Sequence, residues 1–163
     1  MLSILIPVYN FDVTDYVKGL WKQAENSGRK YEIILADDAS DLKYRQLNQE
    51  LQKYENIQFI PSERNIGRSR IRNFLAKQAK YEYLIFTDCD SGLVSDDYLE
   101  KYLALCRGEI VVSGGRLYPS EKPDTDKNTL LQWTYGTKRE TAEAAQRNKK
   151  PNASFMTNNF LIS

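Results

Sequence analysis

The stretch Tyr81-Glu82-Tyr83-Leu84-Ile85-Phe86-Thr87-Asp88-Cys89-Asp90 decides how this chain is interpreted. Its short apolar and aromatic run with a β-branched centre predicts a buried strand. The strand ends in two carboxylates, Asp88 and Asp90, which lie on the same side if the extended conformation persists through them. Two like charges at short range repel each other, and a bound divalent cation would relieve that repulsion. An isolated Asp-x-Asp is more typical of a solvated turn, so the choice depends on the surrounding chain.

The composition predicts one ordinary globular domain. The chain has 163 residues, of which 41% are hydrophobic and 28% are charged, enough for a sizeable core. The 23 lysines and arginines nearly cancel the 22 aspartates and glutamates, so no basic field indicates binding to nucleic acid or to an anionic membrane surface. The sequence contains no histidine, which excludes Ser-His and Cys-His nucleophiles and histidine-ligated zinc.

The same composition predicts the compartment. Two cysteines, Cys89 and Cys106, are too few for a disulfide framework, and no signal peptide precedes the first strand. No apolar run reaches the roughly 20 residues that a transmembrane helix needs. We therefore expect a cytoplasmic chain with no transmembrane segment.

Strands and helices are predicted to alternate from the N-terminus onward. Strand-like runs lie at 2–10, 31–35, 57–60, 81–90 and 109–113, and apolar residues recur at helical spacing between them. This alternation predicts an α/β fold with a mainly parallel sheet flanked by helices. The helix after the second strand should carry Tyr44, Leu47, Leu51 and Tyr54 on one face, and Ser95 should cap a later helix. The residues expected to be buried in the sheet are Ile4, Ile6, Ile33, Ile34, Leu84, Ile85, Val111 and Val112.

The character of the sequence changes after residue 117. A polar loop at 118–126 is followed by one or two helices at about 128–148, and the pattern becomes strand-like again at 154–162. The chain stops inside that apolar run, where native domains seldom end. We therefore expect a single domain truncated at its C-terminus.

Ligands of open parallel sheets bind outside the carboxyl ends of the strands. Distinctive residues follow four predicted strands at that edge, namely Pro7-Val8-Tyr9-Asn10, Asp37-Asp38, Asn65 with Gly67, and Asp88-Cys89-Asp90. Acidic groups on two strands, with a glycine-containing helix entry between them, indicate a polar ligand site.

Each group at this edge suits part of a nucleotide. The Asp38 carboxylate could accept hydrogen bonds from a base or from ribose hydroxyls, and Tyr9 could stack on the base or belong to the core. Backbone N–H groups near Gly67 and a guanidinium of Arg68 or Arg72 could face a phosphate, although Arg72 fits a surface ion pair equally well. Mg²⁺ or Mn²⁺ would lie at Asp88 and Asp90 and bridge a diphosphate.

These motifs resemble the glycosyltransferases of family two, which have the GT-A nucleotide-sugar-binding fold. The ordered matches are Ser3–Asn10, Glu32–Ser40, Asn65-Ile66-Gly67 with Arg72-Asn73, and Phe86–Asp90, which together span residues 2 to 90. A weaker match at Phe155–Phe160 resembles a later segment of the family beside the sugar. Ile71 departs from the alanine usual in the family, a packing change that we expect to be harmless.

The resemblance implies a Rossmann-like GT-A domain that transfers a sugar, with inversion, from a metal-bound UDP-sugar to a glycan or lipid-linked acceptor in polysaccharide synthesis. Pro7 and Tyr9 would line the uracil pocket, and Asp90 would ligate Mn²⁺ or Mg²⁺ directly, with Asp88 toward the ribose and diphosphate. The full set implied for the nucleotide-sugar is Pro7, Val8, Tyr9, Asn10, Asp38, Asn65, Gly67, Arg72, Asp88, Cys89, Asp90, Asn158 and Asn159.

The resemblance also implies what this chain lacks. Residues 1–117 would form the nucleotide-binding core and 118–163 the start of an acceptor-side region, with the catalytic base of the family expected downstream of Ser163. The carboxylates after Asp90, at Glu121, Asp124, Asp126, Glu140 and Glu143, lie in polar segments without apolar framing. We therefore expect nucleotide binding with very poor sugar transfer. Exposed core surface could also lead to a homodimer, and a longer parent could lie at the inner face of the membrane.

Two other functions are compatible with parts of the sequence. A nucleotide-binding module without transferase activity would use the same edge of the sheet. A phosphatase that uses Asp-x-Asp fits less well, because its acidic pair should follow the first core strand.

Overall fold

The computed structural model describes residues 1–123, 127–153 and 155–163, so that Asp124 and Asp126 lie outside the described residues. The elements in chain order are β1 (Leu2–Val8), α1 (Thr14–Asn26), β2 (Tyr31–Asp37), α2 (Leu42–Gln49), the 3₁₀ helix η1 (Glu50–Lys53), β3 (Ile57–Pro61), α3 (Arg68–Gln78), β4 (Tyr83–Thr87), α4 (Tyr98–Leu103), β5 (Val111–Ser113), α5 (Lys127–Arg139), α6 (Ala144–Arg147), the 3₁₀ helix η2 (Pro151–Ala153) and β6 (Asn159–Ile162).

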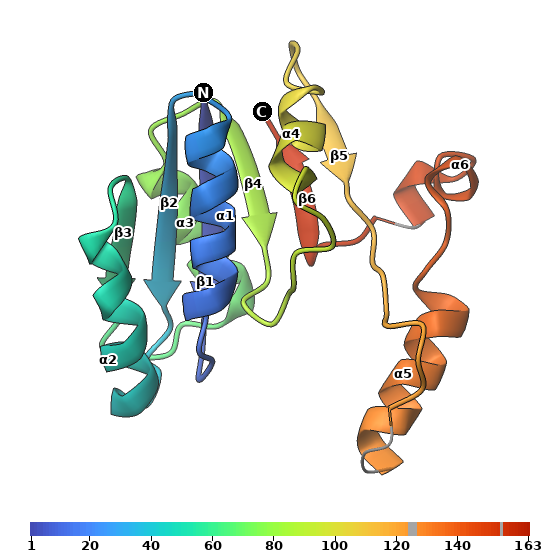
Figure 1. Ribbon diagram of the computed structural model, residues 1–163, viewed down its shortest axis with the longest axis horizontal. Coiled ribbons are helices and arrows are strands. Elements are labelled where there is room, and N and C mark those ends of the chain that lie inside the picture. The colour runs from blue at the N-terminus through green and yellow to red at the C-terminus, as the bar shows by residue number, and fades with distance from the viewer. Residues whose placement is uncertain (124–126, 154) are drawn as a thin grey trace.

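The strands form one mixed sheet in the order β3-β2-β1-β4-β6-β5 (Figure 1). The pairs β1–β2, β2–β3 and β1–β4 are parallel, whereas β6 is antiparallel to both β4 and β5. The predicted mainly parallel α/β sheet is confirmed, and the stretch that decided the interpretation forms β4 beside the central strand β1. The late strand β6 separates β4 from β5, so part of the region after residue 117 completes the sheet.

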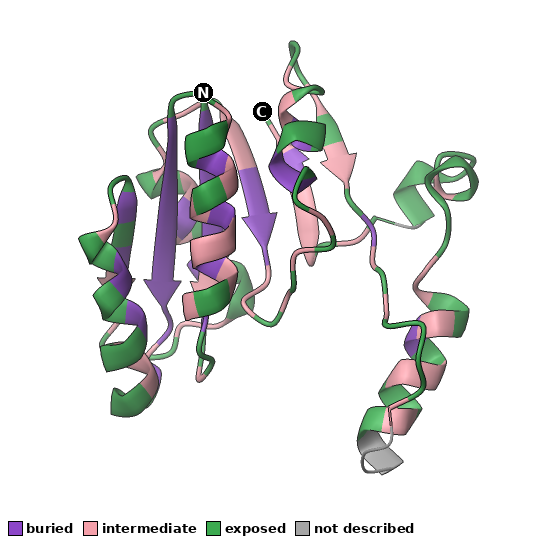
Figure 2. Cartoon of the chain, in the orientation of Figure 1, coloured by how far each residue is buried: buried purple, intermediate pink, exposed green. Residues whose placement is uncertain are grey.

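Each face of the sheet has its own core. On one face, alternate strand residues such as Ile4, Ile33 and Ile85 pack against α1, α4 and η1. On the other face, Leu5 and Ile34 pack with residues of α3. Because both faces are covered, β1 and β2 consist of nearly continuous apolar runs, as buried parallel strands do, and Figure 2 shows them as the most buried part of the molecule.

Pro7 ends strand pairing on one side only. The register between β1 and β4 stops at Leu5 with Phe86, whereas the register between β1 and β2 continues to Val8 with Asp37. Proline lacks the N–H that a ladder needs, and β1 ends one residue after Pro7.

The expected burial of the fifth strand is wrong for Val111. Its side chain is 67% exposed, and Val112 and Leu84 are half-buried rather than buried. The reason is that β5 is a three-residue strand at the edge of the sheet. An apolar run alone does not distinguish a central strand from an edge strand.

Two helix predictions also need correction. The helix expected to start at Ser95 is α4, which begins at Tyr98 after an N-cap at Asp97. In α2, Leu47 is 47% exposed and Asn48 is fully buried. The Asn48 side chain accepts a hydrogen bond from Val13 N–H at 3.0 Å and donates one to Phe11 C=O at 2.8 Å. Asn48 therefore fixes the β1–α1 loop.

Replacing Asn48 by alanine will lower the free energy of unfolding by about 1–3 kcal/mol, because a buried N–H and a buried C=O lose their partners. Leu47→Ala is the matched control on the same helix, and we expect a change within about 0.5 kcal/mol because that side chain is exposed. Urea denaturation followed by circular dichroism measures both. Equal losses in the two variants would contradict the assignment.

The segment between β5 and β6 carries α5 and α6, which stand apart from the sheet (Figure 1). Both helices have mainly exposed and half-buried residues where their side chains are described (Figure 2). None of the helices in the described ranges combines the length and the apolar character needed to cross a membrane.

Candidate functional site

The loops after β1 and β2 are tied together at the carboxyl edge of the sheet. Asn10 N–H donates to Ser40 Oγ at 2.9 Å, and Asp41 N–H donates to Asn10 Oδ1 at 2.7 Å. Asn10 has a φ of 50°, a left-handed conformation that asparagine tolerates better than most residues. These bonds hold the preceding Tyr9 at the edge with 53% of its surface exposed. Tyr9 is therefore not a core aromatic and is free to contact a ligand.

Asp38 lies at the same edge but is 4% exposed. Its two carboxylate oxygens accept hydrogen bonds from Ile66 N–H at 2.7 Å and from Gly67 N–H at 2.9 Å. The N–H groups that were expected to face a phosphate therefore face Asp38 in this structure. Gly67 has a φ of 87°, which brings its N–H toward the carboxylate at the start of α3. Each carboxylate oxygen keeps a further lone pair for a ligand.

Asp88 forms the centre of a charged cluster. Its carboxylate pairs with Arg68 at 2.9 Å and with Arg72, and its backbone N–H donates to Asn158 C=O at 2.9 Å. Burial lowers the pKa of the Arg72 guanidinium below its usual value. Arg72 also reaches Thr157 C=O at 3.4 Å, so that this cluster joins α3, the end of β4 and the segment before β6.

Asp90 differs from Asp88 in having a free carboxylate. It is exposed and forms no hydrogen bond or ion pair with any residue that the structure describes. Cys89, between the two, is half-buried beside the Tyr9 backbone, and burial raises the pKa of its thiol.

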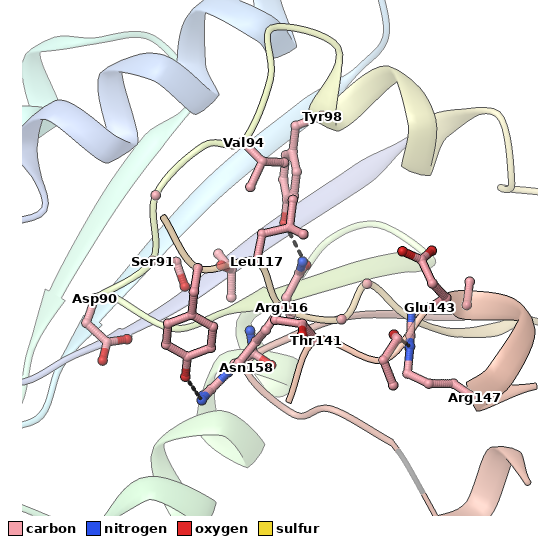
Figure 3. Close-up of a pocket in the computed structure, with 18 of the residues that line it drawn as sticks. Asp90, Ser91, Val94, Tyr98, Arg116, Leu117, Thr141, Glu143, Arg147 and Asn158 are labelled. Atoms are coloured by element: carbon pink, nitrogen blue, oxygen red, sulfur yellow. Dashed lines mark hydrogen bonds between the residues drawn. The ribbon is translucent and has the colours of Figure 1, made fainter. Parts of the chain in front are cut away.

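A cavity of about 460 Å³ opens next to Asp90 (Figure 3). Of the residues predicted from the sequence, Asp90, Asn158 and Asn159 line it. Asn158 has a buried side-chain oxygen without a hydrogen-bond partner among the described residues. Such an atom indicates a place where a ligand or water completes the hydrogen bonding.

A tyrosine network supports the floor of this cavity. Tyr98 and Tyr102 of α4 both donate to Asn159 Oδ1, at 2.7 and 2.6 Å, and Tyr16 bonds Thr87 Oγ1 at 2.6 Å. The spacing of Tyr98 and Tyr102 in the sequence fits one face of a helix, but such spacing says nothing about where a hydroxyl bonds. The network fixes β6 and the end of β4 relative to α1 and α4.

This network predicts a loss of stability at alkaline pH. Burial raises the pKa of Tyr16 and of Tyr102 from 10.0 to about 12, and it also raises the pKa of Tyr98. Between those values the folded state binds more protons than the unfolded state, so the free energy of unfolding must fall as pH rises. We expect this stabilisation to be complete below pH 10 and to be lost as pH rises through about 12.

Urea denaturation across that pH range tests the expectation. Tyr102→Phe has no phenolic proton at this position, and its stability should therefore depend less steeply on alkaline pH than that of the wild type. A wild-type stability that does not fall above pH 10 would contradict the assigned burial.

Residues after β5 line the rest of the cavity, and sequence analysis did not identify them as site residues. They include Arg116, Tyr118, Glu143 and Arg147. Glu140 Oε2 accepts hydrogen bonds from Tyr118 Oη at 2.5 Å and Arg116 Nη1 at 2.8 Å, and these bonds lower the pKa of its carboxyl. In the sequence, only Gly114 and Gly115 indicate that the backbone after β5 lies close to other residues. In the structure, Gly115 lies against the guanidinium of Arg147.

Ser163, beyond which the catalytic base was expected, lies at the opposite edge of the sheet from the cavity. Its N–H donates to Ile110 C=O at 3.2 Å, and its Oγ accepts a hydrogen bond from Ile110 N–H at 3.0 Å. It follows β6, whose other end at Asn159 pairs with Thr87 at the carboxyl edge. Ser163 therefore takes no part in lining the cavity, and the position of the base downstream of it stays a prediction.

The structure therefore brings the predicted residues to one edge in three groups. Tyr9 and Asn10 lie on the first loop, Asp38 contacts the Asn65–Gly67 segment, and Asp88, Cys89 and Asp90 follow β4, which contacts Asn158 and Asn159. Pro7 and Val8 end β1 beneath them. That Tyr9, Asp38, Asp88 and Asp90 line a single cleft stays a prediction.

An α/β sheet of this order, with an acidic pair after a strand next to the central one, defines a GT-A type domain. Glycosyl transferase family 2 matches the chain over residues 3–161, and the chain belongs to this family. Membership of a glycosyltransferase family argues against the interpretation of the chain as a phosphatase.

Curated relatives are much longer than this chain. The chain is 38% identical over 105 residues to poly(ribitol-phosphate) beta-glucosyltransferase of Bacillus spizizenii, covering 62% of this chain and 16% of that protein. It is 28% identical over 137 residues to chondroitin synthase of Escherichia coli, covering 81% of this chain and 19% of that protein.

Solved structures share the fold. Mannosyltransferase PcManGT from Pyrobaculum calidifontis, in complex with GDP-Man and Mn²⁺, superimposes with a TM-score of 0.61 at 18% identity over 69% of this chain and 34% of that one. TarS 1-349 from Staphylococcus aureus, in complex with UDP-GlcNAc, gives a TM-score of 0.58 at 23% identity over 76% of this chain and 38% of that one.

Proposed function

We propose that this chain is the donor-binding part of an inverting glycosyltransferase that takes its sugar from a metal-bound UDP-sugar. The observation that carries the proposal is the free carboxylate of Asp90, which follows β4 and lines a cavity together with Asn158 and Asn159. Because the chain belongs to a glycosyltransferase family, sugar transfer is the chemistry proposed for this edge of the sheet. The complex of TarS with UDP-GlcNAc supports a UDP-sugar, and the complex of PcManGT with GDP-Man makes a GDP-sugar the alternative donor.

In this proposal the uracil stacks near Tyr9, with Pro7 and Val8 below it and Asn10 fixing the loop. Asp38 holds the base or the ribose through lone pairs that Ile66 and Gly67 do not use. Arg72 and Asp88 lie toward the ribose and the diphosphate, with Asn65 and Cys89 at the margins. Asn158 and Asn159 face the sugar side of the cavity.

The residues present fit a divalent metal at Asp90. Mn²⁺ and Mg²⁺ are bound through oxygen, and Mg²⁺ typically uses one or two carboxylates together with substrate phosphates. Asp90 offers an exposed carboxylate without a protein partner among the described residues, whereas the charge of Asp88 is already compensated by Arg68 and Arg72, which weakens its attraction for a cation. When bound, the metal would supply charge neutralisation for the departing diphosphate. The Mn²⁺ in PcManGT supports this part of the proposal.

The general base is proposed to lie downstream of Ser163 and not among the described residues. A base should have a pKa near the working pH, but the hydrogen bonds from Tyr118 and Arg116 lower the pKa of Glu140. Glu143 lines the cavity but is exposed, with no neighbouring group positioning its carboxylate in the described part of the chain. A nucleotide-binding module with little transfer is therefore the second candidate function.

The acceptor side is proposed from the relatives. The name of the Bacillus spizizenii relative specifies poly(ribitol-phosphate), which supports an acceptor in cell-surface polysaccharide synthesis. The proposal also includes a nucleotide-binding core at 1–117 and the start of an acceptor-side region at 118–163. It further includes a cytoplasmic location and the formation of a homodimer.

Thermal unfolding with a panel of nucleotides tests the donor. With Mn²⁺ present, UDP should raise the melting temperature more than GDP or ADP at equal concentration, because a ligand stabilises the folded state by mass action. Chelation of the metal should remove most of the shift. Equal shifts from all three nucleotides would refute the choice of UDP.

A further inference from the structure

The cavity extends beyond the residues that the proposed nucleotide site uses. In Figure 3, Asp90 lies at one end of the lining, and Glu143 and Arg147 lie at the other. Arg147 is the last residue of α6 and is half-buried. No part of the donor proposal involves this end.

The Arg147 guanidinium is held in a fixed position by neutral groups. Its Nε donates to Ala142 C=O at 3.1 Å and its Nη1 donates to Ser113 C=O at 3.0 Å. Carbonyl groups orient the side chain but do not neutralise it. Within residues 1–123, 127–153 and 155–163, Arg147 forms no ion pair, and its Nη2 has no hydrogen-bond partner.

Gly115 makes this position possible. A Cβ added at residue 115 would lie 3.0 Å from Arg147 Nη2 and 3.3 Å from Cζ, so the guanidinium would have to shift by a few tenths of an ångström. Gly115 also has a φ of 81°, which disfavours other residues. The guanidinium therefore lies against the backbone with its orientation already fixed, and little entropy remains to be lost on binding.

The neighbouring charges do not compensate Arg147. Arg116 is neutralised by Glu140 at 2.8 Å. Glu143, four residues before Arg147, forms no ion pair with it within the described ranges, and Asp90 lies at the opposite end of the lining. Arg147 is thus a preorganised cation with free donors on a cavity wall.

We propose that Arg147 forms an anion-binding subsite that receives a phosphate or carboxylate group of the acceptor. A planar guanidinium with free N–H groups matches the oxygens of either group. The inference deepens the proposed function and rests on it, since it assigns the Asp90 end of the cavity to the donor and the Arg147 end to the acceptor. It defines the substrate class as an acidic acceptor rather than a neutral glycan.

Binding of paired small probes to the chain tests this subsite. The pairs are ribitol 5-phosphate with ribitol, and glucuronate with glucose, titrated by calorimetry with UDP and Mn²⁺ present and again without them. We expect at least one charged probe to bind about tenfold or more tightly than its neutral partner, as expected for charge-assisted hydrogen bonds. The pair that shows the preference identifies phosphate or carboxylate as the source of the charge.

Variants separate a local contact from general charge. Arg147→Gln should abolish the preference, Arg147→Lys should keep part of it, and Lys149→Gln, which removes an exposed charge two residues away, should keep all of it. The affinity for UDP should stay at the wild-type value in all three variants. Melting temperatures check that each variant folds, and the Lys variant preserves the test if the Gln variant does not.

The possible failures are distinguishable. Equal binding of charged and neutral probes by the wild type, or an unchanged preference in Arg147→Gln, would overturn the subsite. A loss of UDP affinity in Arg147→Gln would assign Arg147 to the donor diphosphate and overturn it too. A wild type that prefers charged probes but does not bind UDP would refute the proposed function and leave the anion site standing.

Discussion

Replacing Asp90 by asparagine will weaken the binding of UDP in the presence of Mn²⁺ by at least about tenfold, and by up to about 100-fold. Asparagine keeps the shape of the side chain but removes the charge that a divalent cation requires. The carboxylate of Asp90 has no other partner among the described residues, so that the substitution disturbs no contact of the folded chain there. In chelator, where the metal no longer contributes, the wild type and Asp90→Asn should bind UDP equally.

Isothermal titration of UDP with Mn²⁺ and with chelator measures this difference. Asp96→Asn is the matched control, because Asp96 is also exposed but lines the groove between α1 and α4 instead of the cavity. It should bind UDP like the wild type. Equal affinities of Asp90→Asn and the wild type in Mn²⁺ would show that the metal is held elsewhere.

The second large effect is on stability. Asp88→Asn will lower the free energy of unfolding by about 2–4 kcal/mol, because removing one member of a largely buried ion pair leaves the other charge without compensation. The side chains of Asp88 and Arg72 are only 16% and 14% exposed, and Arg68 adds a second positive charge to the cluster. With Asp88 neutral, Arg68 and Arg72, which lie four residues apart on α3, both lose the charge that compensates them.

Asp15→Asn provides the control for an exposed pair. Asp15 is 99% exposed and lies 3.6 Å from Lys18, and its loss should cost no more than about 0.5 kcal/mol. Chemical denaturation of the two variants at the same pH compares them. A loss in Asp88→Asn as small as in Asp15→Asn would mean that the cluster around Asp88 contributes little to the fold.

Much of the fold follows from local pattern. The alternation of apolar runs and helical spacing was enough to predict β1, β2 and β4 and the helices between them, because each strand is buried on both faces. The position of β6 between β4 and β5 was not predictable in the same way. Its four residues, Asn159–Ile162, carry no signal for which neighbour they pair with or in which direction.

In the candidate site, too, the residue types were predictable from the sequence, whereas the contacts between distant residues were not. Motifs that depend on residue type, such as Asp88-Cys89-Asp90 and Asp38, were identified from the sequence. The bonds that set their availability were not, because they join residues far apart in the chain: Asp38 accepts from Ile66 and Gly67, and Asp88 pairs with Arg68 and Arg72. Arg147 was missed for the same reason, since its role depends on Gly115 and on the carbonyl of Ser113.

The central claim is that UDP and a divalent metal bind together at the carboxyl edge beside Asp90. Paramagnetic broadening of amide signals in the ¹⁵N spectrum tests it directly, with substoichiometric Mn²⁺ added before and after UDP. The account predicts that signals of Ser91, Gly92 and Asn159 broaden, and more strongly once UDP is present, while Glu32 and Lys80, which contact each other away from this edge, stay sharp. Broadening centred elsewhere, or broadening beside Asp90 that UDP does not increase, would contradict it.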